Sequence, residues 1–513
     1  MTDSNVFTAL RAAFPADLDA TAIETADGPG APLAYSWRDL ERGTAMIANL
    51  LAGLELPAGS RVAVQTDKSV EALMLYLAVL RAGFVYLPLN TAYQRAEIEY
   101  FIGDAEPAVV VCAPKHFAWL SQLAFQAGTR NVFTLGDDRS GTLLERAAQM
   151  SAEHAPVPKA ADDLAAILYT SGTTGRSKGA MLTHGNLLSN ARTLKSYWGW
   201  RPGDVLIHAL PIFHVHGLFV ASHGALLNGS KMIWFARFEP KAVIARMSEA
   251  TVFMGVPTLY VRMLAEPALT REACARMRLF LAGSAPLLPE TFAEWESRSG
   301  HRIVERYGMS ETVMLTSNPY HAADGERRAG TVGFALPGVG VRVHDEHGRP
   351  CAAGEIGGIE VRGPNVFSGY WRMPEKTREE FTADGWFKTG DVGRLDERGC
   401  LTIVGRSKDL IISGGYNVYP AEIEATINEM PGVAESAVVG VPHRDFGEGV
   451  IAMVVPRPGA TLDGAAIVAE LKGRIANFKV PKQVFVVSEL PRNTMGKVQK
   501  NLLRQQHQGL FGG

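Results

Sequence analysis

The sequence contains few cysteines, and their spacing excludes two classes of site. Only 4 of its 513 residues are cysteine, namely Cys112, Cys274, Cys351 and Cys400. No two of them have the C-x-x-C spacing of a metal or redox site, and four cysteines in so long a chain do not form a disulfide framework. We therefore expect reduced, buried thiols.

Long apolar runs and an excess of charge of one sign are also missing. The strongest apolar run, residues 72–80, is too short to span a bilayer. The N-terminal segment has early acidic residues and lacks the continuous apolar stretch of a secretory signal. The net charge of -2 gives no basic field that would attract nucleic acid or an anionic membrane surface. We expect a cytoplasmic enzyme with small-molecule substrates and no nucleic-acid, membrane or obligatory protein partner.

Helix-like and strand-like segments alternate through the first part of the chain. With 47% hydrophobic residues, the chain has enough apolar material for more than one buried core. Residues 69–81 and 94–102 have helical periodicity, and each is followed by a short strand-like run, at residues 84–89 and 107–112. This alternation predicts an α/β fold with parallel or mixed sheets.

The pattern changes after Gly330 and again after Arg406. Short β-rich pieces between glycine and aspartate turns predict a compact β-subdomain. Beyond Arg406 an α+β pattern continues for about a hundred residues, which is a usual size for a domain. We therefore predict an N-terminal domain at residues 1–405 and a C-terminal domain at residues 406–513.

The segment TSGTTGRSKGA, residues 170–180, is suited to binding a polyphosphate. It follows the strand-like run LAAILY and contains three glycines, five hydroxyl side chains and a lysine. Main-chain N–H groups and hydroxyls can donate to phosphate oxygens, and the lysine can neutralise their charge. It is not a Walker A loop, and its composition alone fits a flexible surface loop equally well. The candidate ATP-binding residues here are Thr170, Ser171, Gly172, Thr173, Thr174 and Lys178.

This loop resembles the phosphate-loop signature of the adenylate-forming superfamily, which includes acyl-CoA synthetases. Four more segments resemble its other motifs in the expected order: ERYGMSET (305–312), WFKTGDVG (386–393), GRSKDLIISGGYNVYP (405–420) and PRNTMGKVQK (491–500). The resemblance covers nearly the whole chain. It implies a large N-terminal domain of layered α/β subdomains plus a β-subdomain, with a small mobile α+β C-terminal domain. It also implies ATP, Mg²⁺ and coenzyme A, used through an acyl-adenylate intermediate.

The resemblance assigns roles around the nucleotide. It implies that Tyr307 stacks on the adenine and that Glu311 holds Mg²⁺, a hard cation that prefers oxygen ligands. Asp391 would accept hydrogen bonds from the ribose hydroxyls, with Arg406 assisting. The other residues implied to line the ATP site are Ser284, Ala285, Glu305, Arg306, Gly308, Ser310 and Lys497.

The resemblance also implies catalytic residues and a moving domain. Lys497 would stabilise the negative charge that develops between the acid and the α-phosphate, and His214 is a second catalytic candidate. Lys408 matches the hinge about which similar enzymes rotate their C-terminal domain between half-reactions. The residues implied to contact coenzyme A are Gly414, Gly415 and Tyr416.

Polar residues at the expected acyl-pocket positions indicate the acid. Arg262, Arg306, His216 and Ser284 stand where relatives that use fatty or aromatic acids tend to have small or apolar residues. A buried guanidinium requires an anion, and its fork matches a carboxylate. Because the reacting carboxylate faces ATP, these residues indicate a second carboxylate and hence a small dicarboxylic acid. The alternative is that either arginine forms a structural salt bridge to a protein acid.

Four segments together resemble the malonyl-CoA synthetase branch of the family: LPIFHVHGL (210–218), GVPTLYVR (255–262), MRLFLAGSAPLL (277–288) and ERYGMSET (305–312). The likeness implies that Arg262, Arg306, His216 and Ser284 hold the distal carboxylate of malonate. The other two substrate-binding candidates, Val215 and Met309, would border its C2 carbon. Methylmalonate is a further expected substrate, because one methyl group changes discrimination by only ~1–3 kcal/mol.

Other interpretations remain open. His214 and His216 could bind zinc with His208 or His223, although no cysteine or carboxylate occurs between Asp204 and Glu239. The enzyme could use another short or aryl acid, or could load a carrier protein, although no phosphopantetheine motif precedes the end of the chain. A non-catalytic binding protein would be expected to lack Lys497, Glu311 or Asp391, and all three are present.

Overall fold

The computed structural model divides the chain into two compact units. It describes residues 3–26, 32–170, 177–413, 416–493 and 496–511. The first unit comprises Met1–Gly340 and Arg362–Gly385, and the second comprises Val341–Val361 and Trp386–Gly513. The β-rich segment after Gly340 thus groups with the C-terminal residues. The predicted domain boundary between residues 405 and 406 stays a prediction.

The first unit contains a seven-stranded mixed sheet that carries both ends of the phosphate loop. Its strand order is β18-β8-β7-β4-β3-β5-β6, with β3 to β7 parallel and β8 antiparallel to β7. The strands are β3 (Arg61–Gln65), β4 (Val85–Pro88), β5 (Val109–Cys112), β6 (Asn131–Thr134), β7 (Leu164–Thr170), β8 (Lys178–Thr183) and β18 (Gly369–Tyr370). One face packs against α4 (Arg95–Ala105) and α5 (Phe117–Gln126) through apolar side chains.

A nine-stranded sheet in the same unit carries the acid-binding candidates. Its order is β15-β14-β13-β12-β11-β9-β10-β1-β2, and β9 to β13 run parallel. The strands are β1 (Thr21–Thr25), β2 (Ala34–Ser36), β9 (Val205–His208), β10 (Lys231–Trp234), β11 (Val252–Gly255), β12 (Leu279–Ala282), β13 (Val304–Tyr307), β14 (Thr316–Ser317) and β15 (Phe334–Ala335). Ligands of such sheets bind at the carboxyl ends of the parallel strands.

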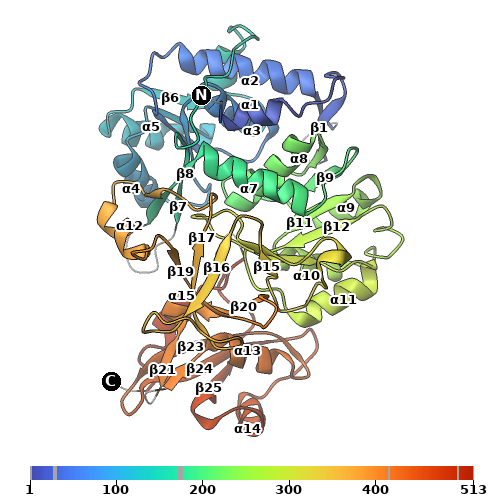
Figure 1. The fold of residues 1–513 in the computed structure, drawn as a ribbon, viewed down its shortest axis with the longest axis vertical. Helices are drawn as coiled ribbons and strands as arrows, with labels where there is room; N and C mark the ends of the chain where they lie inside the picture. The colour runs from blue at the N-terminus through green and yellow to red at the C-terminus, as the bar shows by residue number, and fades with distance from the viewer. Residues whose placement is uncertain (1–2, 27–31, 171–176, 414–415, 494–495, 512–513) are drawn as a thin grey trace. The chain divides into compact units, whose positions relative to one another are not determined.

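Helices cover both sheets (Figure 1). The helices of this unit not yet given are α1 (Val6–Arg11), α2 (Trp37–Ala52), α3 (Val70–Arg81), α6 (Thr142–Ala147), α7 (His184–Tyr197), α8 (His223–Asn228), α9 (Pro240–Ala245), α10 (Pro257–Leu264), α11 (Pro289–Ser299) and α12 (Pro374–Glu380). The predicted helix at residues 69–81 is confirmed as α3. Ser69 caps it by accepting a hydrogen bond from the Ala72 N–H, which satisfies an otherwise unpaired donor of the first turn.

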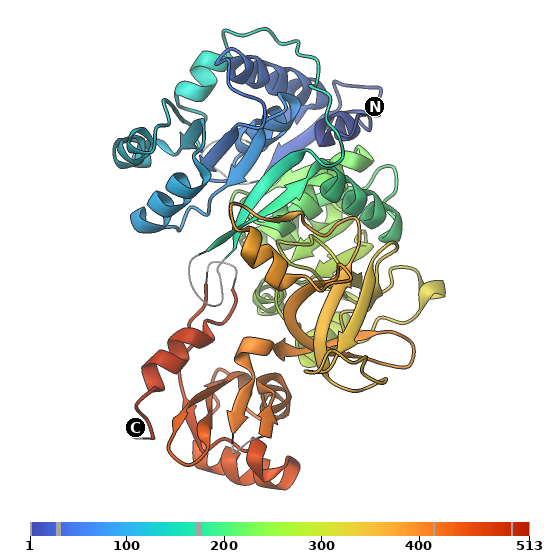
Figure 2. The ribbon, with the colours of Figure 1, turned by 60° about the vertical axis from the view of Figure 1, so that its left-hand side comes forward.

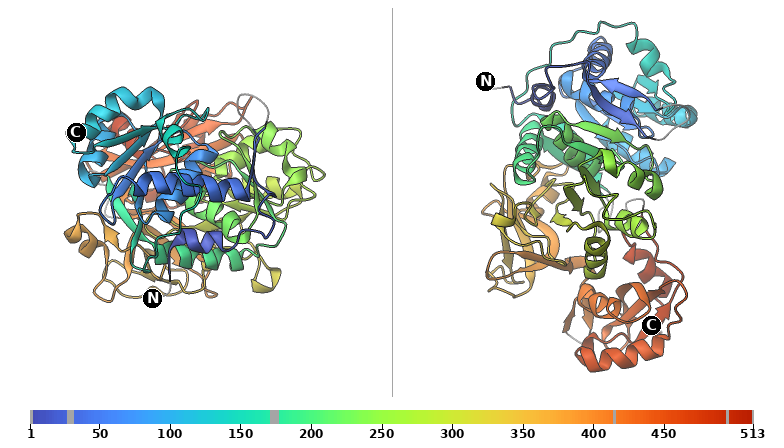
Figure 3. Two further views of the ribbon diagram at one scale, coloured as in Figure 1. Left: turned by 90° about the horizontal axis from the view of Figure 1, so that it is seen from above. Right: turned by 90° about the vertical axis from the view of Figure 1, so that its right-hand side faces the viewer.

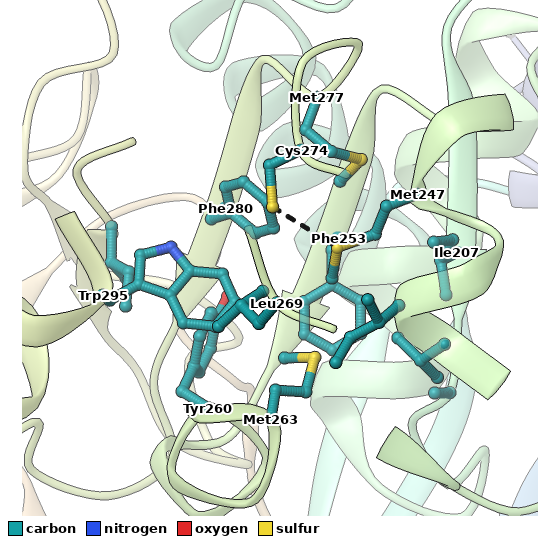
Figure 4. Packing of buried hydrophobic residues seen from close by; sticks show 14 of the residues in the cluster. Ile207, Met247, Phe253, Tyr260, Met263, Leu269, Cys274, Met277, Phe280 and Trp295 are labelled. Carbon is teal, nitrogen blue, oxygen red and sulfur yellow. Dashed lines mark hydrogen bonds between the residues drawn. The ribbon is translucent and has the colours of Figure 1, made fainter. Parts of the chain in front are cut away.

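Helices α9, α10 and α11 pack on one face of the nine-stranded sheet (Figure 4). At the centre of this core, the ring of Tyr260 meets that of Trp295 edge to face at 4.8 Å, and Phe280 meets Trp295 at 4.9 Å. The Tyr260 hydroxyl donates to the carbonyl of Leu281 at 2.7 Å. Because protein cores are close-packed, this cluster gives the strands that it packs against a rigid support.

The second unit has two antiparallel-rich sheets, drawn in yellow to red in Figure 2 and Figure 3. A four-stranded sheet has the order β16 (Gly340–His344), β17 (Gly357–Arg362), β19 (Phe387–Leu395) and β20 (Leu401–Arg406). A five-stranded sheet comprises β21 (Ile411–Ser413), β22 (Tyr416–Val418), β23 (Val433–His443), β24 (Gly447–Pro456) and β25 (Gln483–Val486). Its faces are covered by α13 (Pro420–Asn428) with α14 (Gly464–Arg474) and by α15 (Lys500–His507).

The structure tests two expectations, that the thiols are buried and that no segment spans a membrane. All four cysteines are free, but Cys351 is only partly buried, so the expectation of four buried thiols is wrong for this residue. It follows the turn after β16, and its N–H donates to the Val343 carbonyl at 3.0 Å. Within the described ranges, no helix has both the length and the apolar character needed to cross a membrane. The predicted cytoplasmic location stays a prediction.

Candidate active site

The carboxyl ends of neighbouring parallel strands bring the acid-binding candidates together. Ser284 follows β12, Arg306 lies in β13, and His216 begins the π-helical turn η2 (His216–Ser222) after β9. Side chains alternate across a strand, so Arg306 points to one face of β13 while Glu305 and Tyr307 point to the other. One short strand can therefore serve the acid on one side and the nucleotide on the other.

Arg306 is buried without a protein anion. Its side chain is among the largest fully buried ones, the residue being 2% exposed, and its Nε, Nη1 and Nη2 atoms have no hydrogen-bond partner among the described residues. Burial lowers the pKa of the guanidinium to about 9, so the group is still charged at neutral pH. An uncompensated buried charge is costly, and the structural salt bridge considered for this residue is not formed. A ligand anion would supply the missing partner.

Gly283 makes room for this guanidinium. A Cβ atom at position 283 would lie 2.5 Å from Nη1, 2.6 Å from Cζ and 2.8 Å from Nε of Arg306. These distances are below any ordinary contact, and the atoms belong to a rigid planar group. Glycine at this position therefore determines where the positive charge lies.

His216 is a second buried polar group near Arg306. It is fully buried, and its Nδ1 lies 3.5 Å from the Ser284 hydroxyl. Within the part of the chain that the structure describes, its Nε2 has no hydrogen-bond partner. Burial, followed by the charge of Arg306, lowers the pKa of His216 well below its ordinary value. The imidazole is therefore neutral. Ser284 has a φ of 73°, a left-handed conformation uncommon for residues other than glycine.

Two predicted residues, His214 and Val215, directly precede His216 in the chain. Val215 is buried, and partly buried His214 accepts a hydrogen bond at Nδ1 from the His216 N–H at 3.3 Å. This contact orients the His214 ring. Its predicted catalytic role stays a prediction.

Arg262 differs from Arg306. It is exposed on α10, with its guanidinium 4.9 Å from the centroid of the Phe238 ring. Expecting a buried arginine at position 262 is therefore wrong, because the helix turns this side chain away from the core that Tyr260 and Met263 enter. The argument from burial applies to Arg306 alone.

The ends of the phosphate loop are held by β7 and β8. Thr170 and Lys178 face each other in the strand pair, and the Thr170 hydroxyl donates to the Lys178 carbonyl at 3.4 Å. Lys178 Nζ lies 3.2 Å from Glu380 Oε1 and 4.3 Å from the centroid of the Tyr370 ring. The predicted residues Ser171, Gly172, Thr173 and Thr174 lie outside the described residues.

Glu311 and this lysine both contact Tyr370. Its carboxylate is buried and accepts a hydrogen bond from the Tyr370 hydroxyl at 3.1 Å. Tyr370 therefore contacts both the lysine expected at the phosphates and the carboxylate expected at Mg²⁺. Tyr307 is buried, and a Cβ at Gly308 would lie 1.9 Å from the Val313 carbonyl, so only glycine fits there.

Glu305 carries a strongly perturbed carboxyl group. Burial raises its pKa to about 8, with a hydrogen bond from the Leu287 N–H to Oε1 at 3.1 Å opposing the shift. Its Oε2 is buried without a partner. Of the remaining predicted residues in this unit, Ala285 follows Ser284, while Met309 and Ser310 follow Gly308, and all three are partly buried.

The second unit holds the remaining predicted residues. Asp391 and Arg406 are paired across β19 and β20, with the guanidinium 3.0 Å from the carboxylate. Lys408 lies in a short 3₁₀ helix, Ser407–Asp409, directly after β20. Lys497 is exposed, and its backbone N–H donates to the Asn493 side chain at 3.0 Å.

Of the predicted coenzyme A contacts, only Tyr416 is described. Its exposed ring stacks on that of Phe478 at 4.6 Å. Gly414 and Gly415 lie outside the described residues.

The histidines considered for zinc are engaged elsewhere. His208 Nε2 lies 3.0 Å from the Gly217 carbonyl, and His223 Nε2 lies 2.7 Å from the Tyr76 hydroxyl. Among the residues that the structure describes, no three His, Cys, Asp or Glu side chains are grouped so that they could hold a metal ion.

The structure adds residues that the sequence motifs did not single out. They are Gly283 and Tyr260 at the acid side, Tyr370 and Glu380 at the phosphate side, and Lys68, which contacts His208. Gly283 and Tyr260 lie within four residues of the predicted residues Ser284 and Arg262. The contacts of the others join segments 59 to 202 residues apart, which no local pattern shows.

Comparison with known proteins identifies the family. Residues 12–371 match the model of the AMP-binding enzyme, and residues 422–497 match that of the AMP-binding enzyme C-terminal domain. The chain therefore belongs to the AMP-binding enzyme family, whose members use ATP and coenzyme A. The predicted fold class, a large layered α/β N-terminal domain with a small C-terminal domain, is confirmed.

Individual relatives are similar over most of their length. A malonate–CoA ligase of Arabidopsis thaliana is 35% identical over 482 residues, covering 87% of this chain and 78% of that protein. A sulfoacetate–CoA ligase of Cupriavidus necator is 34% identical over 453 residues, covering 88% of each. The ATP-bound structure of MatB from Rhodopseudomonas palustris is 55% identical, with a TM-score of 0.95 over 99% of this chain and 100% of that one. The predicted enzyme class, an acid–CoA ligase, is confirmed.

Proposed function

We propose that this enzyme joins malonate to coenzyme A at the expense of ATP, releasing AMP and pyrophosphate. The observation that carries the choice of acid is Arg306, a charged, fully buried guanidinium that no anion of the described residues pairs. A distal carboxylate placed there would receive its N–H groups in fork geometry. His216 Nε2 and the Ser284 hydroxyl would provide further donors. The likeness to a malonate–CoA ligase and to MatB supports this assignment.

The first half-reaction forms an acyl-adenylate. An oxygen of the other carboxylate attacks the α-phosphorus of ATP, a P–O bond forms, and the bond to the β-phosphate breaks to release pyrophosphate. Lys497 would stabilise the charge that develops at the α-phosphate, and Lys178 the charge of the departing phosphates. Tyr307 would stack on the adenine, while Asp391 and Arg406 would hold the ribose.

Glu311 fits a role in holding Mg²⁺. Mg²⁺ sites in nucleotide enzymes use one or two carboxylates plus phosphate oxygens, and Glu311 offers one buried carboxylate, already oriented by Tyr370. When bound, the cation would neutralise phosphate charge. Glu311 itself would fix the position of that charge relative to Lys178.

The second half-reaction forms the thioester. The thiolate of coenzyme A attacks the acyl carbon, a C–S bond forms, and AMP leaves with the bridging oxygen. The proposed contacts of coenzyme A are Gly414, Gly415 and Tyr416, and Lys408 is the proposed hinge for a rotation of residues 406–513 between the two steps. No protein nucleophile is needed.

Two further acids follow from the same pocket. Methylmalonate adds one methyl group at C2, beside Val215 and Met309, and is proposed as a weaker substrate. Sulfoacetate keeps a distal anion and is the acid named for a relative, so it is the second candidate substrate. Both retain the charge that Arg306 would recognise.

The test is acid-dependent ATP–pyrophosphate exchange with malonate, methylmalonate, succinate, sulfoacetate and acetate in parallel. We expect malonate to give the highest kcat/KM and acetate the lowest. A preference for acetate would contradict the proposal. Thioester formation on free coenzyme A, without any carrier protein, separates this activity from carrier loading. Lys497→Ala should reduce exchange by about 10²–10³-fold and affect thioester formation from supplied adenylate far less.

A further inference from the structure

Lys68 joins the ends of two strands of the nine-stranded sheet. It follows β3, and its Nζ donates to the carbonyl oxygens of His208 at 2.9 Å and Phe235 at 2.7 Å, where β9 and β10 end. Nζ also lies 3.0 Å from His208 Nδ1 and 4.3 Å from the centroid of the Trp234 ring. The ammonium group is thus held in one position by acceptors from both strands.

These contacts determine the protonation of His208. An ammonium has only donors, so Nδ1 of His208 must accept. The Gly217 carbonyl, 3.0 Å from Nε2, can only accept, so Nε2 must carry the proton. Both partners require the same neutral tautomer, and a protonated imidazole would place an N–H against the ammonium.

The acceptor of this proton belongs to the turn that carries the acid-binding histidine. Gly217 is the second residue of η2, next to His216. Its carbonyl also accepts from the Ser222 hydroxyl at 2.9 Å, and Ser222 Oγ lies 3.1 Å from His208 Nε2. His208 and Ser222 therefore both bind the carbonyl of one peptide unit.

The Cα of Gly217 is confined as well. A Cβ atom at this position would lie 2.1 Å from the Pro211 carbonyl oxygen. With its carbonyl bonded by two side chains and its Cα against the Pro211 backbone, this peptide has little freedom. Single π-turns often occur at functional sites, and here the turn directs His216 toward Ser284 and Arg306.

We propose that Lys68 and His208 form a positioning relay that holds η2 and so determines how tightly the acyl pocket binds its acid. Neither side chain is assigned to substrate or nucleotide. Lys68 selects the tautomer of His208, His208 holds the Gly217 carbonyl, and the adjacent His216 receives its orientation. The relay rests on the proposed function only in that His216 contacts the acid.

The test compares two replacements of His208 that differ in reach. The amide nitrogen of glutamine can occupy nearly the position of Nε2, whereas that of asparagine cannot. By ATP–pyrophosphate exchange with malonate, we expect His208→Asn to raise the malonate KM by about 10–100-fold and to leave the ATP KM within about twofold. His208→Gln should keep the malonate KM within about threefold of wild type.

Lys68→Met tests the other half of the relay. Without the ammonium, only the Gly217 carbonyl still favours the tautomer with the proton on Nε2, so the malonate KM should rise by about 3–10-fold. The matched control is Lys115→Met, which removes an exposed lysine paired with Asp67 and should change neither KM. Ser222→Ala, which removes one donor to the same carbonyl, should cause a smaller rise and serves if His208→Asn does not fold.

Two outcomes would overturn the relay. One is equal KM values for the glutamine and asparagine variants, and the other is a parallel rise of the ATP and malonate KM, as expected from general loosening of the fold. If the wild type activates an acid other than malonate, the proposed function fails, but the same comparison with that acid still tests the relay.

Discussion

The two ends of the active site hold their positive charges in different ways. At the acid end, Arg306 is buried, and all three guanidinium nitrogens are unpaired as far as the described ranges extend. At the phosphate end, Lys178 is paired with Glu380 at 3.2 Å and lies against the Tyr370 ring. One cation thus lacks a partner before ligand binds, and the other already has one.

The difference has energetic consequences. The unpaired guanidinium destabilises the ligand-free protein, so an acid that supplies the partner gains affinity and stabilises the fold. ATP finds a lysine whose charge is already partly compensated, so the gain at Lys178 is smaller. We expect selectivity for the acid to depend on one side chain and nucleotide affinity to be spread over many.

The largest effect should follow from replacing Arg306. Arg306→Met removes the charge while keeping most of the side-chain volume, so kcat/KM for malonate should fall by about 10³-fold. The ligand-free variant should be about 1–4 kcal/mol more stable than wild type, because an unpaired buried charge is gone. ATP–pyrophosphate exchange kinetics measure the change in kcat/KM, and denaturant unfolding measures the change in stability.

Exposed Arg262 is the matched control for Arg306. Arg262→Ala should change kcat/KM for malonate by no more than about threefold, because its guanidinium is in solvent over Phe238. Equal losses in the two arginine variants would contradict the contrast between buried and exposed charge. So would a destabilised ligand-free Arg306→Met protein.

The next largest effect concerns Gly283. Gly283→Ala would place a methyl group within 2.8 Å of three guanidinium atoms, so Arg306 must move and the malonate KM should rise by about 10–100-fold. The φ of Gly283 is not in the left-handed region, so alanine adds no backbone strain. In the double variant with Arg306→Met, the alanine should have little further effect. A full additional loss there would contradict the steric explanation.

Glu305, which precedes Arg306, gives a pH-dependent test of the same burial. Its folded pKa of about 8 lies above the ordinary value of 4.5, so its contribution to stability is complete below about pH 4.5 and is lost as pH rises through 8. Glu305→Gln removes this loss. The variant should therefore gain about 1–3 kcal/mol relative to wild type between pH 5 and pH 9, measured by denaturant unfolding. If the difference in unfolding free energy between the variant and the wild type did not change with pH, the raised pKa of Glu305 would be contradicted.

The smallest effect is expected at the phosphate end. Glu380→Gln removes the partner of Lys178 and should lower the ATP KM by about 2–5-fold, the size of a partly exposed ion pair. The malonate KM should stay the same. A raised ATP KM would show instead that Glu380 orients Lys178 for the phosphates.

The sequence predicts the layers of this fold and the order of its motifs because both depend on local patterns. Helix α3 begins at its Ser69 cap and β7 leads into the phosphate loop, as periodicity and turn residues indicate. Arg306 could be found because a charged residue inside a motif is visible in the sequence. The exposure of Arg262 could not be predicted in this way, since only the rotation of α10 decides whether its side chain is buried, and its predicted contact with the acid stays a prediction.

The remaining site residues depend on distances that the sequence does not contain. Tyr370 reaches Glu311 from 59 residues away, and Lys68 reaches His208 from 140 residues away. Gly283 directly precedes the predicted residue Ser284, but its importance lies in the space it leaves for Arg306 on the neighbouring strand. Such roles follow from the packing of two strands and not from either strand alone.

The close fit of Gly283 under Arg306 also sets an order in which this pocket can change through evolution. A neutral residue at position 306 leaves space in which a side chain at 283 becomes tolerable, whereas a side chain at 283 gained first must displace the guanidinium. A lineage that abandons the distal anion therefore loses the arginine before it fills position 283. A lineage that acquires this anion must keep or regain the glycine first.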